Sequence, residues 1–264
     1  MKANTRMIEN VSLIIFDVGG VFRDSSKALN EGYRRAFAKY EFEYPFSAQT
    51  IWHLRGIGRY NERDMAIRAL LSFLRSGDSL DRVLEGIGAE KELDLALSSN
   101  IRKEDEAMIS AMTDEYKKFF HSESAKDMVD IYAGVGEGIE TLYRSGYKLA
   151  LFTNSSRVTV ARDLKFLDMT MFGMVLSEED VTRKKPSGEG IMKIMEGMGA
   201  SPEETAYVGD TIIDIMAAKD ANCVSISLLC GMGIRKHLEA QKPDFIFKDL
   251  YDAATFIAKS RTLP

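Results

Sequence analysis

Short apolar runs alternate with amphipathic segments in the second half of this chain, and one such run lies near its start. That run, Val11 to Phe16, is almost continuously apolar and stops at Asp17 and two glycines, which predicts a strand buried on both faces and followed by a tight loop. Similar runs predict strands at Lys148–Phe152, Met171–Leu176, Thr205–Val208, Val224–Leu228 and Phe245–Phe247. Segments with helical spacing lie between them, at Gly138–Ser145, Ser156–Leu167, Gly188–Met198 and Asp214–Asp220. Alternation of this kind predicts a parallel sheet covered by helices.

The stretch from about residue 25 to residue 130 has a different pattern. Its apolar residues recur at helical spacing, as in Ile67, Leu70, Leu71 and Leu74, and strand signals are scarce. We therefore expect an all-helical cap domain at 25–131, inserted into an α/β core domain that is formed by 11–24 and 132–258. The core is expected to be a doubly wound parallel sheet.

The composition is that of an ordinary globular protein, with 45% hydrophobic and 28% charged residues. Lys and Arg number 35 against 40 Asp and Glu, so the net charge of −5 gives no extended basic surface for nucleic acid. The two cysteines, Cys223 and Cys230, do not make a disulfide framework and fit a reducing compartment. The run Val11 to Phe16 is too short for a signal peptide core, and no apolar stretch reaches the length of a membrane span. We expect a cytoplasmic protein that binds neither nucleic acid nor membrane.

Polar residues directly follow several of the predicted strands. Asp17 follows the first strand, Thr153 and Asn154 follow Lys148–Phe152, and Asp210 follows Tyr207-Val208-Gly209, while Lys185 lies in the loop that leads to the next helix. Because ligands bind outside the carboxyl ends of the strands in such sheets, these residues are expected to share one site. Together they supply a carboxylate nucleophile, donors for a phosphoryl oxygen, a fixed cation and acidic metal ligands.

Four motifs, in this order and spacing, resemble the haloacid dehalogenase superfamily, and in particular its phosphoglycolate phosphatase-like branch with a helical cap. They are Phe16-Asp-Val-Gly-Gly-Val21, Leu151-Phe-Thr-Asn154, Lys185-Pro186 and Val208-Gly-Asp-Thr-Ile-Ile-Asp214. The resemblance covers the expected core domain, whereas the cap matches only in position and helical character. It implies a Rossmann-like core and a Mg²⁺-dependent hydrolase that acts on a small phosphorylated metabolite.

The resemblance also implies a role for each matching residue. Asp17 resembles the family nucleophile, which attacks phosphorus and forms an aspartyl-phosphate that water later hydrolyses. Thr153 and the N–H of Asn154 resemble the group that holds the phosphoryl oxygens, at a loop that opens a helix. Lys185, directly before Pro186, resembles the lysine that bridges nucleophile and phosphate, and its neighbour Lys184 is expected in solvent.

The resemblance further implies a magnesium site. Its expected ligands are Asp17, the backbone carbonyl of Gly19, Asp210 and Asp214. Asp210 is expected to bind the ion directly, and Asp214 either binds it through water or orients Lys185. Mg²⁺ takes oxygen ligands and keeps several waters, which suits this set.

One position departs from the family pattern. Family phosphatases carry a second Asp two residues after the nucleophile, where it serves as general acid and base, and this chain has Gly19 there. Such a group contributes about 10² to 10⁴ in rate, so its absence costs roughly 3 to 5 kcal/mol of barrier unless another group replaces it.

Other classes of protein would be consistent with the absence of a general acid and base at position 19. A phosphometabolite-binding or regulatory protein would keep the pocket and turn over weakly or not at all. A dehalogenase also lacks that Asp but does not need Mg²⁺, so Asp210 and Asp214 argue against it. A phosphonatase-like enzyme uses a cap lysine as an imine, and the comparable segment Arg55–Arg59 offers arginines instead.

Arg55 and Arg59 lie where family caps present a substrate-specificity loop. Their guanidinium groups suit a carboxylate or a second phosphate, so we expect them to bind a small acidic phosphate such as phosphoglycolate. The sequence does not indicate an oligomeric state.

Overall fold

The computed structural model describes residues 8–260, which divide into two compact units. The first unit contains the chain up to Arg23, Ile131–Gly231 and the chain from His237 onward, and the second contains Asp24–Asp130 and Met232–Lys236. The segment 232–236 was expected in the core domain. It clusters with the second unit instead, because Met232 and Ile234 pack against the apolar cluster of that unit.

A six-stranded parallel sheet forms the centre of the first unit. Its strands are β1 (Leu13–Phe16), β4 (Lys148–Phe152), β5 (Phe172–Leu176), β6 (Thr205–Gly209), β7 (Val224–Leu228) and β8 (Phe245–Phe247). They lie in the order β5-β4-β1-β6-β7-β8, and every neighbouring pair is parallel. The predicted fold class is confirmed, because each predicted strand takes its place in one parallel sheet.

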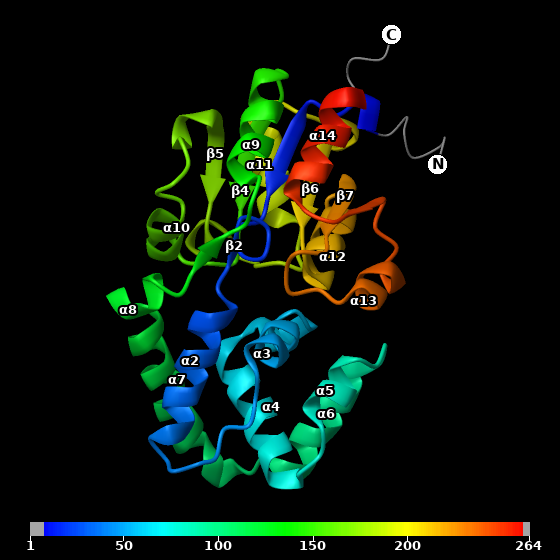
Figure 1. The fold of residues 1–264 in the computed structure, drawn as a ribbon. Helices are drawn as coiled ribbons and strands as arrows, with labels where there is room; N and C mark the ends of the chain where they lie inside the picture. Colours follow the sequence, from blue (N-terminus) through cyan, green and yellow to red (C-terminus); the bar gives the residue numbers. More distant parts are fainter. Residues whose placement is uncertain (1–7, 261–264) are drawn as a thin grey trace. The chain divides into compact units, whose positions relative to one another are not determined.

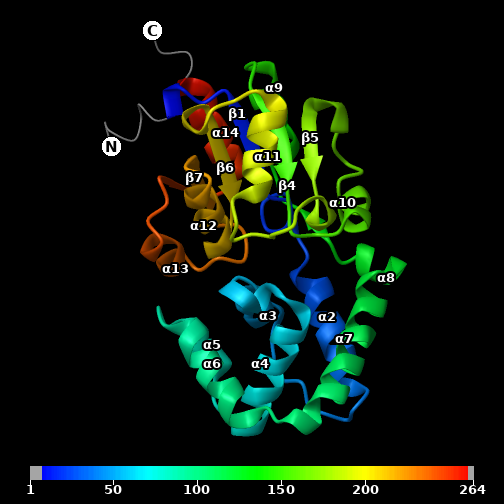
Figure 2. The ribbon, with the colours of Figure 1, turned by 180° about the vertical axis from the view of Figure 1, so that it is seen from behind.

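Helices cover both faces of this sheet. α9 (Val135–Arg144) and α14 (Leu250–Ser260) lie on the face toward the viewer in Figure 1, and α11 (Glu189–Met198) and α12 (Ile212–Asp220) lie on the face seen in Figure 2. β1 contributes to both layers, since Ile14 and Phe16 join the apolar cluster of α9 and α14 whereas Leu13 and Ile15 join that of α11 and α12. This is the alternation of side chains expected of a strand, and it explains why the run Val11 to Phe16 is apolar on both faces.

The remaining elements of the first unit differ in part from the sequence prediction. α10 (Arg157–Asp163) ends earlier than the predicted Ser156–Leu167, because the chain enters a turn in which the N–H of Leu167 donates to Leu164 O. Two helices that were not predicted follow β7 and β8, namely α13 (Arg235–Ala240) and α14. Single 3₁₀ turns complete the unit, at η3 (Met169–Met171), η4 (Glu178–Asp180) and η5 (Pro202–Glu204).

The second unit is helical except at its two ends, where Asp24 and Asp130 each belong to a short strand. Its helices are α2 (Ser26–Ala38), α3 (Ala48–Arg55), η1 (Gly58–Asn61), α4 (Arg63–Ser76), α5 (Leu80–Leu84), α6 (Ala89–Asn100), η2 (Lys103–Asp105), α7 (Glu106–Phe120) and α8 (Glu123–Lys126). β2 (Arg23–Asp24) and β3 (Asp130–Ile131) pair where the chain passes between the units. Within residues 8–260, no helix combines the length and the apolarity that crossing a bilayer requires.

Candidate functional site

Several strand ends meet at one edge of the sheet. Phe16, the last residue of β1, is paired in parallel register with both β4 and β6. Asp17 therefore emerges beside the end of β6, and its N–H donates to Val208 O at 2.9 Å. Thr153 follows β4 and Asp210 follows β6 at the same edge.

Lys185 lies at the centre of the charged groups. Its Nζ is 3.0 Å from Asp17 Oδ1 and 2.6 Å from Asp214 Oδ1, and it donates to the hydroxyl of Tyr207 at 2.9 Å. The contact with Asp17 is an ion pair that lies off the direction of a hydrogen bond. The side chains of Lys185 and Asp214 are each 2% exposed, so water screens these charges very little.

Tyr207 is a site residue that the strand-end pattern misses. Its hydroxyl accepts from Lys185 and donates to Phe152 O at 2.9 Å. Lys185 Nζ also lies 5.5 Å from the centroid of the Tyr207 ring and 5.8 Å from that of Phe152, within the range of cation–π attraction. A signal was present in the sequence, because a phenol inside a fully buried strand needs a hydrogen-bond partner.

Asp214 joins the charged groups to the start of α12. Its Oδ2 accepts from the N–H of Thr211 at 2.9 Å, from Thr211 Oγ1 at 2.5 Å and from the N–H of Asp210 at 3.2 Å. Because Thr211 also caps the helix in return, the pair forms a capping box. Asp214 thus fixes the loop after β6 with one oxygen and binds Lys185 with the other.

Asn154 holds the backbone of Lys185. Its Nδ2 donates to Lys185 O at 3.1 Å, and its Oδ1 accepts from the N–H of Lys185 at 3.0 Å. The side chain of Asn154 is therefore committed to the loop that carries the lysine, which leaves only its N–H for the predicted contact with phosphate.

Thr153 is buried at the end of β4. Its Oγ1 accepts from the N–H of Ser155 at 3.2 Å, and its own N–H donates to Leu176 O. α10 begins only at Arg157, with Ser156 as its N-cap, so Thr153 and Asn154 lie ahead of the helix rather than in its first turn.

The burial of the site shifts the pKa of each of its central groups. Burial raises the pKa of the Asp17 carboxyl, and the positive charge of Lys185 opposes this only in part. Burial alone would lower the pKa of Lys185, but the charges of Asp17 and Asp214 outweigh it and raise that pKa. Burial also raises the pKa of Tyr207 well above its ordinary value. Lys185 is thus charged and Tyr207 neutral near neutral pH.

The carboxylates of the site form a donor set that suits a hard cation. Asp17, Asp210 and Asp214 each offer one oxygen atom, and these three atoms lie within 4.8 Å of one another. Lys185 forms ion pairs with Asp17 and Asp214. Three carboxylates this close together repel one another, so a cation bound among them is electrostatically favoured. Oxygen ligands in this number and proximity fit Mg²⁺.

Two glycines allow the close approach of Asp210. A Cβ atom on Gly20 would lie 2.0 Å from Asp210 Oδ2, and one on Gly231 would lie 2.1 Å from the same oxygen. Gly20 also has a φ of 75°, which side chains other than that of glycine rarely adopt. Gly19, whose carbonyl is an expected metal ligand, lies in the same loop and is bridged to Arg23.

Arg55 and Arg59 belong to the helical unit. Arg55 is buried and donates to Tyr33 Oη at 2.7 Å and to Asn61 Oδ1 at 3.3 Å. Arg59 is half-exposed and donates to Asp94 Oδ1 through Nε and Nη2, at 3.1 and 2.6 Å. The structure therefore gathers the predicted site residues of the sheet unit and leaves these two within the helical unit.

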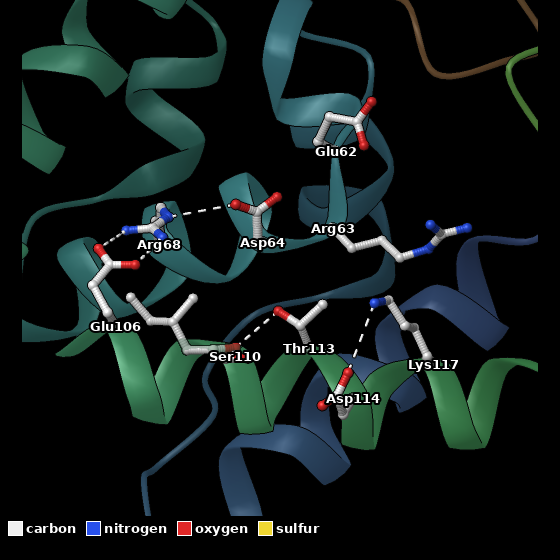
Figure 3. A pocket seen from close by; sticks show the side chains of 10 residues that line it. Glu62, Arg63, Asp64, Arg68, Glu106, Ser110, Thr113, Asp114 and Lys117 are labelled. Carbon is white, nitrogen blue, oxygen red and sulfur yellow. Dashed lines mark hydrogen bonds and ion pairs between the residues drawn. The ribbon is translucent and has the colours of Figure 1, made fainter. Parts of the chain in front are cut away.

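A cavity of about 380 Å³ lies between α4 and α7 of the helical unit (Figure 3). Arg68 donates to both carboxylate oxygens of Glu106 and lies 3.6 Å from Asp64, while Lys117 lies 3.7 Å from Asp114. Most of the charge in this cavity is thus paired within its own wall, and none of the predicted site residues lines it.

Comparison with known families gives one clear match. Residues 79–228 match the model of the haloacid dehalogenase-like hydrolases. These residues run from the helical insertion through the end of β7 and include Thr153, Lys185 and Asp210.

Individual relatives are similar over different shares of the chain. A pyrophosphatase PpaX of Bacillus mycoides is 30% identical over 165 residues, which cover 62% of this chain and 76% of the relative. A phosphoglycolate phosphatase of Shigella boydii is 28% identical over 249 residues, which cover 92% of this chain and 91% of the relative. Among solved structures, a haloacid dehalogenase-like family hydrolase of Streptococcus pneumoniae superposes with a TM-score of 0.68 at 17% identity, covering 94% of this chain and 98% of that one. At that identity the structural likeness concerns the fold alone.

Proposed function

Because this chain belongs to the haloacid dehalogenase-like hydrolases, we propose that it is a Mg²⁺-dependent phosphatase that forms an aspartyl-phosphate on Asp17. The family assignment indicated by the four motifs is confirmed, and the chain is a hydrolase of that family. The observation that carries the proposal is Lys185, whose Nζ lies within 3.0 Å of both Asp17 and Asp214 in a buried site.

Each residue of the site has a chemical task in this reaction. Asp17 Oδ attacks the phosphorus, and the bond between phosphorus and the leaving oxygen breaks. Lys185 places its positive charge beside the nucleophile and the incoming phosphoryl group, which lowers the repulsion between two anions. The Thr153 hydroxyl and the N–H of Asn154 donate to the phosphoryl oxygens.

The carboxylates of Asp17, Asp210 and Asp214 would hold Mg²⁺, together with the carbonyl of Gly19. When bound, the ion neutralises negative charge on the phosphoryl oxygens. The fit is supported by the three acidic oxygens, which belong to buried side chains and lie within 4.8 Å of one another.

The substrate in this proposal is a small acidic phosphate. Two relatives carry names that point to such compounds, pyrophosphate for one and phosphoglycolate for the other. Phosphoglycolate is the compound expected from the sequence, with Arg55 and Arg59 binding its carboxylate. The hydrogen bonds of these arginines to Tyr33, Asn61 and Asp94 would have to be shared with or exchanged for that carboxylate.

Gly19 favours a second candidate, a phosphometabolite-binding or regulatory protein with weak or no turnover. The position offers no proton donor or acceptor on its side chain, while Lys185 and the carboxylates that bind phosphate and metal are kept. Dehalogenase and phosphonatase-like reactions rank below both candidates. Dehalogenases do not need the metal that Asp210 and Asp214 suit, and the segment Arg55–Arg59 offers no lysine to form an imine.

The test is phosphate release from an aryl phosphate and a panel of small acidic phosphates, with and without Mg²⁺. The proposal expects turnover that requires Mg²⁺ and falls roughly 10³-fold or more in Asp17→Asn. The matched control is Asp252→Asn, an exposed residue of α14, which should leave turnover unchanged. Binding of phosphates without turnover would instead favour the binding protein.

A further inference from the structure

The loop after the nucleophile carries no group that could protonate a leaving oxygen. Its sequence from residue 18 to residue 22 is Val-Gly-Gly-Val-Phe. Gly19 is partly exposed, and its φ does not lie in the left-handed region, so its backbone does not require glycine. Gly20 differs, since its positive φ and the nearby Asp210 oxygen exclude a side chain.

Lys185 and Asp214, the charged pair beside Asp17, already use their protons and acceptor atoms. Lys185 donates to Asp214 and to Tyr207, and its ammonium also forms the ion pair with Asp17. Asp214 accepts at both oxygens, from Lys185 at one and from Thr211 and the Asp210 N–H at the other. Both of its oxygens are therefore held as acceptors.

The hydroxyl of Thr153 is assigned to the phosphoryl oxygens, and the O–H of Tyr207 and the S–H of Cys230 point at backbone carbonyls. Tyr207 donates its proton to Phe152 O at 2.9 Å, and its hydroxyl oxygen accepts from Lys185. Cys230 directs its thiol to Gly20 O, with Sγ 3.5 Å from that oxygen. Both protons are thus directed to backbone carbonyls.

We propose that this site, if it acts as the phosphatase proposed above, selects its substrate by leaving group and cleaves phosphoanhydrides and acyl phosphates in preference to alkyl phosphate esters. A phosphate or carboxylate leaving group departs as a stable anion and needs no proton at the moment of cleavage. An alkyl ester would release an alkoxide, which is a strong base and depends on a proton donor.

The bond changes balance without an added acid. A lone pair of Asp17 Oδ forms the new bond to phosphorus, and the electrons of the broken P–O bond leave with the phosphate or carboxylate anion. In the second step a water oxygen bonds to phosphorus, Asp17 recovers its carboxylate electron pair, and the proton of the water passes to the released phosphate. Among small acidic phosphates, this ranks pyrophosphate and acyl phosphates ahead of phosphoglycolate.

The test measures kcat/KM in Mg²⁺ for acetyl phosphate, pyrophosphate, a series of aryl phosphates of graded phenol acidity, and phosphoglycolate. The structure predicts a steep decline as the leaving group becomes more basic, with phosphoglycolate about 10² to 10⁴ below acetyl phosphate. Gly19→Asp adds a carboxyl to the nucleophile loop and should raise turnover of phosphoglycolate far more than that of acetyl phosphate. The matched control is Gly136→Asp, on an open surface of α9, which should change neither.

The outcomes separate this inference from the proposed function. Asp17-dependent turnover that is equal for acetyl phosphate and phosphoglycolate in the unaltered protein overturns the leaving-group selection and keeps the phosphatase. It would mean that a group outside the nucleophile loop supplies the proton. Equal kcat/KM values across the substrate series in the unaltered protein overturn the leaving-group selection even where Gly19→Asp does not fold. Absence of turnover with every substrate overturns both proposals.

Discussion

Single residues in the site hold one another in place through buried charge. Within the described residues, Lys185 is the only cation among the side chains that contact Asp17 and Asp214. Its ammonium also donates a hydrogen bond to the hydroxyl of Tyr207. Removing one member of such a cluster leaves the others buried without a counter-charge. That penalty is larger than the net stabilisation of the intact pair.

Exchanging Lys185 for methionine should therefore destabilise the protein as well as inactivate it. Without added metal, we expect the free energy of unfolding of Lys185→Met to fall by about 3–5 kcal/mol, because two buried carboxylates lose their ammonium. Lys184→Met is the matched control, since Lys184 pairs with Glu178 at the surface and should cost less than about 1 kcal/mol. Urea unfolding of both variants checks this, and equal losses would show that the Lys185 contacts do not stabilise the fold.

The sequence predicts the charged residues of the site better than it predicts their partners. Asp17, Thr153 and Asp210 could be placed together because parallel strands end at the same edge of a sheet. The buried strand around Tyr207 indicates that its hydroxyl needs a partner but not which one. The hydrogen bonds of Asn154 to Lys185 depend on which loop folds over the strand end, and no local pattern encodes that. Thr211 was missed as well, although Thr-x-x-Asp at the start of a helix is a capping signal.

At the scale of elements, side-chain caps decide where several helices begin. Asp105 is such a residue in the helical unit, where it accepts from the N–H of Arg102 at 2.8 Å and so caps η2, which leads directly into α7. Two further bonds come from Arg75 of α4, at 2.7 and 2.6 Å. One carboxylate thus ties α4 to the start of α7.

This contact predicts a dependence of stability on pH. The hydrogen bonds from Arg75 lower the pKa of Asp105 to about 2, below the ordinary value of about 3.9. The stabilisation is therefore complete above pH ~4 and is lost as the pH falls through the folded-state pKa. Asp105→Asn should lower the free energy of unfolding by about 1.5–3 kcal/mol at pH 7, and the difference should shrink between pH 4 and pH 2.

Unfolding at several pH values checks the sign of this effect. Asp78→Asn, at an exposed position just after α4, serves as the control and should follow the unaltered protein at every pH. A deficit of Asp105→Asn that stays constant down to pH 2 would mean that the bonds to Arg75 do not depend on the charge of the carboxylate.

Helices and strands were predictable to different degrees. The six strands of the sheet could be predicted because each is a short apolar run, and β1, β6 and β7 are buried along their whole length. α14 was missed although Leu250, Ala253, Ala254 and Ile257 have helical spacing and are buried on the sheet. α10 was predicted too long, since apolar residues continue past Asp163 into a turn that closes on Leu164.

At the scale of the whole molecule, the order of the strands creates the site. β1 lies between β4 and β6, which are more than 50 residues apart in sequence, and so the loops after all three strands meet. Alternating strands and helices predict a parallel sheet but not the order of its strands, because that order depends on long-range pairing. The family resemblance supplied what periodicity alone could not.

A metal ion that binds only the folded protein should raise the stability of the whole chain. Mg²⁺ at one hundred times its Kd would add about 2.7 kcal/mol, visible as a higher Tm in thermal unfolding. Asp210→Asn should lose most of this increase, and Asp252→Asn should keep it. If the Tm of the unaltered protein does not change with Mg²⁺, the proposed magnesium site is contradicted.

The most direct test of the central claim is the mass of the intact protein after brief reaction with acetyl phosphate and Mg²⁺, followed by an acid quench. We expect a fraction of chains to be heavier by one phosphoryl group, with the modification on Asp17 and none in Asp17→Asn. Phosphate release without any modified chain, or a phosphoryl group on another residue, would contradict Asp17 as the nucleophile.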